Sequence, residues 1–400
     1  MIQARLRALM GGDALVGTGA MGQPIVAPRD EAAVAMLIDT AGAYGWRVGI
    51  VGAGSWSPPD CPADVLLSTR RLDTIVQVSP SDLVVVTQAG VRGRALRTAL
   101  ADAGAWAVVD HPGRDRTVGS AIATATAGPL RSGFGPVRDH VLGVTVVTGE
   151  GRIVRPGGTV MKNVAGYDLT KLVVGSFGAF GVVTSVTLRL RAVPRADVTL
   201  IGSGRRDELL DSALAMTDAG LTPSGLELLS PVAASQQRWH LAIRLTGREA
   251  EVAAARDGVR RCASVDLVEL PPREAAGAWD RLLETACGHA LTLRIGSLPT
   301  GLERCLDQLE HDLGESWTSV SAPAGIVRWS GNASADSLRR FRQWAAEQEM
   351  PVTLERAPWP ILAAVGHFGA YREGAGRLAE ALRRTFDPHD VLLTAAGTSQ

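Results

Sequence analysis

A glycine-rich loop placed directly after a strand is the feature that most narrows the fold of this chain. The β-like run Trp46-Arg-Val-Gly-Ile-Val51 leads straight into Gly52-Ala-Gly-Ser55. Glycines at such a position let backbone N–H groups approach a pyrophosphate closely, although an ordinary turn has the same composition. The nicotinamide pattern G-x-G-x-x-G is not completed, because residue 57 is a serine and Pro58-Pro59 would interrupt the following helix. The loop therefore argues against a nicotinamide site.

Two more glycine-rich segments follow in the first half of the chain. Small residues between Thr117 and Pro129 permit backbone contact with a flat ligand, or the tight start of a helix. The segment 155–181 holds Lys162 and Lys171, the two lysines among 41 basic residues. In a chain that otherwise uses arginine, a retained lysine indicates a need for a compact, rotatable ammonium group. We expect functional residues in this segment, while Lys171 is best explained as a surface partner of Asp168.

The hydrophobic pattern changes near residue 195. Before it, short β-like runs alternate with glycine turns and end in the strand 182–190. After it, Arg244, Arg294 and Arg328 each lie in a short strand that leads into an amphipathic helix. The predicted strands are 240–246, 291–295 and 326–329, their helices are about 249–262, 300–314 and 336–348, and a strand 361–365 and a helix 374–386 complete the half.

This pattern predicts an α+β protein. Residues 1–195 form the first domain, and residues 196–375 form a cap domain with an antiparallel sheet and helices stacked on one face. Residues 376–400 are expected to return to the first domain.

Composition excludes several classes of protein. The formal net charge is zero, which argues against nucleic-acid partners and against a polybasic membrane patch. No signal peptide is evident, and no stretch reaches the roughly 20 apolar residues of a membrane helix, so a cytoplasmic protein is expected. The four cysteines, at positions 61, 262, 287 and 305, show no C-x-x-C spacing, which argues against a metal or iron–sulfur site held by this chain.

Taken in order, the three glycine-rich segments resemble the FAD-binding domain of the vanillyl-alcohol oxidase/p-cresol methylhydroxylase (PCMH) type. The resemblance rests on the first loop, on T-V-G-S-x-I-A with Gly128-Pro129 and V-R-D, and on G-S-F-G-x-F-G-V-V-T, within about residues 20–195. Met161-Lys-Asn-Val-Ala-Gly-Tyr-Asp168 is similar to the FAD-binding E subunits of bacterial glycolate oxidases. The resemblance implies FAD lying between two α+β subdomains.

The resemblance also implies which residues hold the cofactor. Serine at position 55 stands where some members attach FAD through a histidine, and no histidine precedes His111, so noncovalent binding is expected. The implied FAD contacts are Gly52, Ala53, Gly54, Ser55 and Trp56 at the pyrophosphate loop, and Thr117, Val118, Gly119, Ser120, Gly128, Pro129, Gly181, Val182 and Val183 elsewhere.

The candidates for catalysis lie mostly outside these loops. Lys162 could neutralise a reduced flavin or a substrate carboxylate, or simply bind loop carbonyls. Arg244, Arg294 and Arg328 would clamp a carboxylate if their sheet face turns toward the flavin; otherwise that face is solvated or meets a partner. His367 could accept the hydroxyl proton of a substrate, or simply be packed.

The resemblance implies the FAD-binding subunit of a glycolate oxidase-like complex that oxidises a small 2-hydroxy acid. Electrons would pass to an iron–sulfur partner, beside a second FAD subunit, with the complex peripheral at the inner membrane. The family's Asn-Pro-Gly-Arg tail and the H-x-G-D-G-N-x-H cluster of its catalytic subunits are absent. Two alternatives therefore stay open: a self-sufficient FAD oxidase or dehydrogenase, and a non-catalytic flavin-binding or scaffold subunit.

Overall fold

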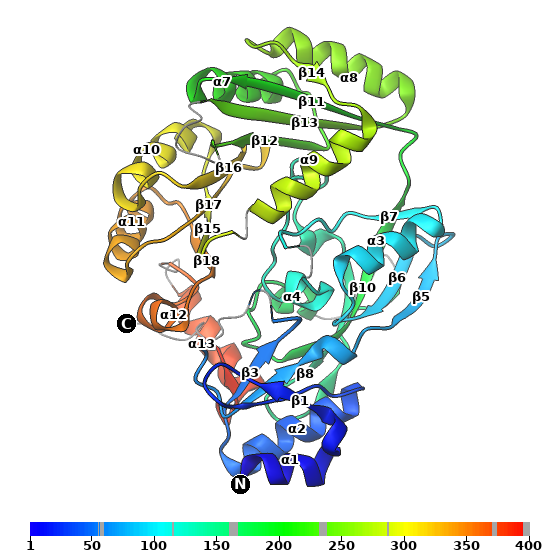
Figure 1. Cartoon of the computed structure of the whole chain (residues 1–400), viewed down its shortest axis with the longest axis vertical. Coiled ribbons are helices and arrows are strands. Elements are labelled where there is room, and N and C mark those ends of the chain that lie inside the picture. The colour runs from blue at the N-terminus through cyan, green and yellow to red at the C-terminus, as the bar shows by residue number, and fades with distance from the viewer. Residues whose placement is uncertain are drawn as a thin grey trace.

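The protein has two lobes, which Figure 1 shows one above the other. The computed structural model describes residues 1–54, 56, 60–113, 116–159, 167–231, 238–285, 288–369 and 374–394. The lower lobe carries two sheets and the upper lobe one large sheet. The chain crosses to the upper lobe after Ala192, where strand β10 (Val182–Ala192) ends, and it returns to the lower lobe near the C-terminus. The α+β class expected from the sequence is confirmed.

The first sheet is mixed, in the order β1-β2-β4-β3-β19, and β3 runs parallel to both of its neighbours. Helix α2 begins where the Asp30 side chain accepts a hydrogen bond from the Ala33 N–H, and it ends at Gly45 in the left-handed conformation. Its buried residues pack with α1 against the sheet. The elements are α1 (Ile2–Met10), β1 (Leu15–Thr18), β2 (Pro24–Val26), α2 (Glu31–Tyr44), β3 (Val48–Val51) and β4 (Val65–Ser68).

The second sheet is antiparallel, in the order β5-β6-β10-β8-β9, with β7 pairing the end of β10. Val182 and Val147 lie beside the first sheet's core, so the two sheets share apolar contacts. The elements are β5 (Ile75–Ser79), β6 (Val84–Gln88), α3 (Gly93–Asp102), β7 (Ala105–Ala107), α4 (Val118–Ala123), α5 (Arg131–Phe134), β8 (Val141–Val147), β9 (Ile153–Val154), α6 (Leu169–Val173) and β10 (Val182–Ala192).

The cap is built on an antiparallel sheet in the order β14-β11-β13-β12-β16-β17-β15-β18. Its outer face packs on α7, α8, α10 and α11, and α9 lies on the opposite face, toward the lower lobe (Figure 1). The elements are β11 (Ala196–Gly204), α7 (Arg206–Asp218), β12 (Gly225–Leu229), β13 (Trp239–Gly247), α8 (Glu249–Cys262), β14 (Val268–Glu269), α9 (Pro272–Thr285), β15 (Leu291–Gly296), α10 (Leu302–Leu313), β16 (Trp317–Ser321), β17 (Ile326–Gly331), α11 (Ala335–Glu347), β18 (Val352–Arg356) and α12 (Trp359–Val365).

The three arginine-bearing strands are confirmed as β13, β15 and β17, each followed by a helix. The strand predicted over 361–365 is wrong, because these residues belong to helix α12. The apolar run Ile361-Leu-Ala-Ala-Val365 is too short to distinguish a strand from a buried helical turn by its pattern. Pro360 in the first turn and Gly366, which ends the helix with a positive φ of 68°, favour the helix.

The C-terminal segment lies against the first sheet. Helix α13 (Ala375–Phe386) leads to β19 (Leu392–Leu393), which pairs with β3 in parallel. Between them, the Asp387 carboxylate accepts hydrogen bonds from the N–H groups of Val391 and Leu392, at 2.9 and 2.8 Å. The strand that precedes the glycine loop is therefore flanked by residues more than three hundred positions later.

Replacing Leu392 by alanine tests this docking. The side chain is 1 % exposed and belongs to the core that also contains Val48 of β3. We expect a loss of about 2–5 kcal/mol in the free energy of unfolding, from lost apolar burial plus the cavity left behind. Denaturant unfolding measures it, and Leu378→Ala, at a side chain that is 62 % exposed, is the matched control. Equal effects of the two variants would contradict the docking.

Candidate functional site

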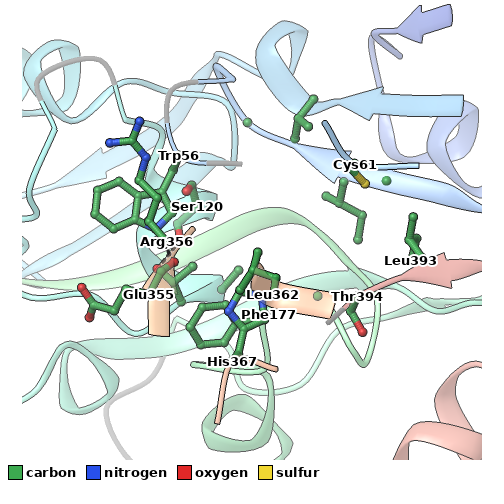
Figure 2. Close-up of a pocket in the computed structure, with 18 of the residues that line it drawn as sticks. Trp56, Cys61, Ser120, Phe177, Glu355, Arg356, Leu362, His367, Leu393 and Thr394 are labelled. Atoms are coloured by element: carbon green, nitrogen blue, oxygen red, sulfur yellow. Dashed lines mark hydrogen bonds between the residues drawn. The ribbon is translucent and has the colours of Figure 1, made fainter. Parts of the chain in front are cut away.

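A pocket lies where the two subdomains of the lower lobe meet the cap. Figure 2 shows side chains from distant segments turned toward it, including Trp56, Ser120, Phe177, Glu355 and His367. The pocket is thus assembled from residues that the sequence separates by more than three hundred positions.

The first glycine loop forms one wall of this pocket. A Cβ added at Gly52 would lie 2.5 Å from the Thr117 hydroxyl oxygen and 3.5 Å from Ser120, so this backbone touches the start of α4. The Ser68 hydroxyl, at the end of β4, donates a hydrogen bond to the Gly52 carbonyl at 3.0 Å and so anchors the loop. Gly54 has a φ of +83°, which side chains rarely adopt. The loop therefore exposes bare backbone to the pocket; Ser55 lies outside the described residues.

The second glycine-rich segment forms the next wall. Its Thr117 side chain caps α4 by accepting from the Ser120 N–H, and Gly119 packs where a Cβ would lie 2.6 Å from Ala89. Farther on, the Asp110 carboxylate accepts hydrogen bonds from the Gly128 and Leu130 N–H groups, at 3.1 and 2.8 Å. Burial raises the pKa of Asp110 to about 6, against the lowering effect of these two N–H groups.

The remaining implied FAD contacts lie on or beside these elements. Gly181 has a φ of +137° and leaves no room for a Cβ, which would lie 2.4 Å from Val147. Val182 and Val183 begin β10 and are buried, and Gly181 and Val183 line the pocket. Pro129 lies instead beside a second cavity, away from the glycine loop. Lys162 lies outside the described residues.

Two of the three cap arginines come together. Arg294 and Arg328 are register partners on β15 and β17, and each alternates with core residues of the outer face, so both turn toward the lower lobe. Arg294 donates to the Ala125 carbonyl at 2.7 Å and Arg328 to the Ala127 carbonyl at 2.9 Å. Arg294 and Arg328 therefore hold the loop segment 124–128, which resembles part of a flavin-binding segment and is called the flavin loop below.

Glu355 lies between these two arginines. Its carboxylate oxygens are 3.5 Å from Arg294 Nε and 3.3 Å from Arg328 Nε, and its side chain is fully buried. The register between β15 and β18 shifts at this residue, and such a bulge re-aims a side chain. Burial alone would raise the pKa of Glu355, but Arg328 and Arg294 hold it below the ordinary value.

Arg244 is not part of this cluster. It shares the inward-facing side of the sheet, but β13 is separated from β17 by β12 and β16, which places it about 14 Å away at the usual strand spacing. Its guanidinium forms a two-pronged pair with Asp197 on the neighbouring strand, at 3.0 and 2.6 Å. The structure thus separates Arg244 from the other two candidates.

His367 lines the pocket from the segment after α12. Its ring stacks on Phe177 at 4.1 Å, and its Nδ1 lies 2.7 Å from the Leu354 carbonyl oxygen. Because a carbonyl only accepts, Nδ1 carries the proton and Nε2 is left as an acceptor. Burial lowers the pKa of His367 to about 4, so the imidazole is neutral at physiological pH. Phe177 has a φ of +53°, a strained value often found at functional sites.

Three buried polar residues escaped the sequence analysis. Arg116 stacks over Trp56 at 3.9 Å and bonds Ser120 and Thr124, while the Trp56 indole donates to the Glu355 carbonyl at 3.0 Å. Glu227 on β12 accepts from the Ser321 hydroxyl. Glu227 interrupts the otherwise apolar strand Gly225-Leu-Glu-Leu-Leu229, and that interruption is the signal that could have pointed to it. Glu355 lies in the mixed strand Val352-Thr-Leu-Glu-Arg356, which carries no such signal.

These walls fit a dinucleotide. Glycine backbone at Gly52, Gly54 and Gly181 suits a pyrophosphate, since added side chains would collide or strain the chain. Trp56 and Phe177 also line the pocket, and one face of each ring is already covered, by Arg116 and by His367 respectively. Among the described residues, no group of acidic, histidine or cysteine side chains could hold a metal ion.

Replacing Gly52 by alanine tests the loop. The new methyl group would collide with the Thr117 hydroxyl and push the loop into the pocket. We expect FAD affinity to fall by at least about tenfold, a loss of about 1.4 kcal/mol. Titration of flavin fluorescence measures it, and Gly12→Ala, with nothing within 4 Å of the added Cβ, is the control. Unchanged affinity in the Gly52 variant would show that the ligand lies elsewhere.

Replacing Glu227 by glutamine tests its protonation. Burial raises the pKa of Glu227 from 4.5 to about 7, so between these values the folded state keeps a proton that the unfolded state has released. The wild-type free energy of unfolding should therefore fall as pH rises through this window. The variant should gain stability relative to wild type from pH 5 to 8, measured by denaturant unfolding of both proteins at each pH. A flat difference for Glu227→Gln would refute a protonated carboxyl.

Comparison with known proteins supports the same cofactor. Residues 23–157 match the family model described as FAD binding domain. The chain is 38% identical over 194 residues to glycolate oxidase subunit GlcE of Escherichia coli, covering 48% of this chain and 53% of that protein. It is 29% identical over 214 residues to the mitochondrial cytochrome-type D-lactate dehydrogenase of Arabidopsis thaliana, covering 52% of this chain and 37% of that protein. The chain thus spans between about a third and a half of these relatives.

The fold also matches along its whole length. The structure of 4-ethylphenol oxidase from Gulosibacter chungangensis superposes with a TM-score of 0.71 over 98% of this chain and 92% of that chain, at 13% identity. At that identity the likeness concerns the fold alone, and both lobes share it. Residues 23–157 thus match an FAD binding domain, and the chain is similar to proteins named as glycolate oxidase subunits and FAD-linked oxidoreductases.

Proposed function

We propose that this chain is the FAD-binding subunit of a glycolate oxidase-like complex that oxidises glycolate or a related 2-hydroxy acid. The observation that carries the proposal is the glycine-walled pocket between the two subdomains, in a chain 38% identical to glycolate oxidase subunit GlcE over the matched region. The mitochondrial D-lactate dehydrogenase is named for a 2-hydroxy acid as well. Both names point to a small acid with a hydroxyl group beside its carboxylate.

FAD, when bound, would supply the acceptor for the hydride that leaves the hydroxyl-bearing carbon. The loop at Gly52 and Gly54 would hold the pyrophosphate with backbone N–H groups, and the start of α4 would flank it. Binding would be noncovalent, because position 55 is serine and no histidine precedes His111. Lys162, which lies in the retained-lysine segment, is proposed to offset negative charge on the cofactor or the substrate.

His367 is proposed to accept the hydroxyl proton. Its Nδ1–H donates to the Leu354 carbonyl, so Nε2 presents a lone pair, and the ring is held by stacking on Phe177. With its pKa lowered to about 4 by burial, the imidazole is ready to accept a proton at neutral pH but is a weak base. Its contribution should therefore disappear only in acid, as Nε2 becomes protonated.

A second function, a subunit that binds flavin without oxidising the acid itself, is favoured by one observation. Arg294 and Arg328, which could hold a substrate carboxylate, already hold Glu355 and the carbonyls of Ala125 and Ala127. A hydroxy acid would have to displace the Glu355 carboxylate to bind the same pair. In that case a sister subunit would perform the oxidation.

The complex is proposed to contain an iron–sulfur subunit that receives the electrons and a second FAD subunit. The support is that a relative is named as one subunit of glycolate oxidase. Such partners would bring the chain to the inner face of the membrane. No helix in the described part of the chain is both long and apolar enough to cross a bilayer.

The visible spectrum of the purified chain tests the proposal. We expect flavin bands with FAD present, and bleaching on anaerobic addition of glycolate or D-lactate, because hydride transfer removes the oxidised flavin absorption. His367→Gln should slow bleaching, and the wild-type rate should be flat above about pH 5 and fall below it, since the pKa of His367 is about 4.

Each other outcome has a definite meaning. Flavin that binds but stays oxidised with both acids would favour the non-catalytic subunit. Bleaching by the isolated chain, with oxygen consumed afterwards, would favour a self-sufficient oxidase. A chain that stays colourless with excess FAD would overturn both.

A further inference from the structure

The inner face of the cap sheet carries two largely buried arginines that would repel each other without a nearby anion. Arg294 and Arg328 lie directly opposite each other on β15 and β17, with side chains 17 % and 8 % exposed. Like charges in this position repel, and little water is present to screen them. Arg131 lies close enough that these two arginines, together with burial as the larger cause, lower its pKa. The face therefore needs an anion.

Glu355 supplies that anion from within the chain. The residue lies at the register shift of β18, where its carboxylate reaches the Nε atoms of both arginines, and its main-chain carbonyl accepts from the Trp56 indole. Arg328 donates a hydrogen bond from Nε to one carboxylate oxygen at 3.3 Å, and Arg294 forms an ion pair with the other at 3.5 Å. Arginine is the residue that proteins most often use to hold a carboxylate. Glu355 thus takes the place of a ligand.

The same arginines hold a strained part of the flavin loop. Ala125 has a φ of +49°, a conformation that a residue with a Cβ rarely adopts, and its carbonyl accepts from Arg294. Arg328 holds the Ala127 carbonyl two residues later. On the other side, the Phe177 N–H donates to the Ala123 carbonyl at 2.8 Å, and Phe177 is itself strained. The loop is therefore held in this shape by groups from outside it.

We propose that Arg294 and Arg328 form a carboxylate site whose permanent occupant is Glu355, and that this cluster locks the cap onto the flavin loop and sets the loop's shape for the cofactor. The three residues are positioning residues. The second half of the proposal rests on the proposed function only in that FAD binds at residues 117–128. The first half, an internal ligand in a carboxylate site, is independent of flavin.

Truncating the Glu355 side chain at Cβ tests the carboxylate site most directly. Glu355→Ala leaves two buried arginines without their carboxylate and a space beside them of the size of formate or acetate. Losing one partner of a buried ion pair leaves the other charge uncompensated. We expect FAD to bind about tenfold or more weakly, and the bound flavin to show an altered visible circular dichroism. Added formate or acetate should restore both, saturably, and should raise the melting temperature of the flavin-free variant.

Two more variants make the test specific. Glu355→Gln keeps the volume but not the charge, so it should weaken FAD binding and gain nothing from acetate, because the space is filled. Asp197→Ala removes the carboxylate partner of Arg244 on the same face of the same sheet, remote from the loop. It should bind FAD as wild type does and show no rescue. If Glu355→Ala does not fold, the glutamine variant still tests the lock.

The outcomes separate this proposal from the proposed function. Wild-type protein that binds no FAD would end the proposed function, yet the acetate-dependent rise in melting temperature of Glu355→Ala would still support the carboxylate site. Unchanged FAD affinity in Glu355→Gln would overturn the lock. Equal responses of Glu355→Ala and Asp197→Ala to acetate would overturn the carboxylate site.

Discussion

One carboxylate between two arginines is the interaction on which the site depends. Without Glu355, the opposed side chains of Arg294 and Arg328 would bring unbalanced charge into a buried sheet face. Each guanidinium group that faces Glu355 also has N–H groups that point to the lower lobe, and these donate to the carbonyls of Ala125 and Ala127. A cluster inside the cap therefore determines the backbone of a loop in the other lobe. Arg116, Trp56 and the Glu355 carbonyl continue this contact toward the first glycine loop.

The parts of the site that the sequence predicted are those whose chemistry is local. A glycine loop after a strand can be recognised because each glycine meets a local need of the backbone. At Gly52 there is no room for a Cβ, and at Gly54 φ is positive. Strand alternation likewise predicted that the cap arginines share one face, and they do. In the same way, the three strand–helix units of the cap were predicted because each is encoded by its own hydrophobic period.

What could not be predicted depends on the order and register of strands. Sequence spacing gives Arg244, Arg294 and Arg328 equivalent places, but sheet order separates the first from the other two by intervening strands. Glu355 meets the pair only because the register of β15 and β18 shifts by one residue there. Helix α12 was mistaken for a strand because five apolar residues carry too little periodicity to decide. Such features depend on which strands pair and in which register, and the local sequence pattern does not specify either.

The cluster also gives the cap a role that does not depend on a substrate. Arg294 and Arg328 hold the Ala125 and Ala127 carbonyls, so the cap contributes to the shape of this loop whether or not an acid enters the pocket. A carboxylate site that is filled by an internal residue acts as a structural element rather than a recognition element. Arg244, which is paired with Asp197 on the same face of the sheet, takes no part in it.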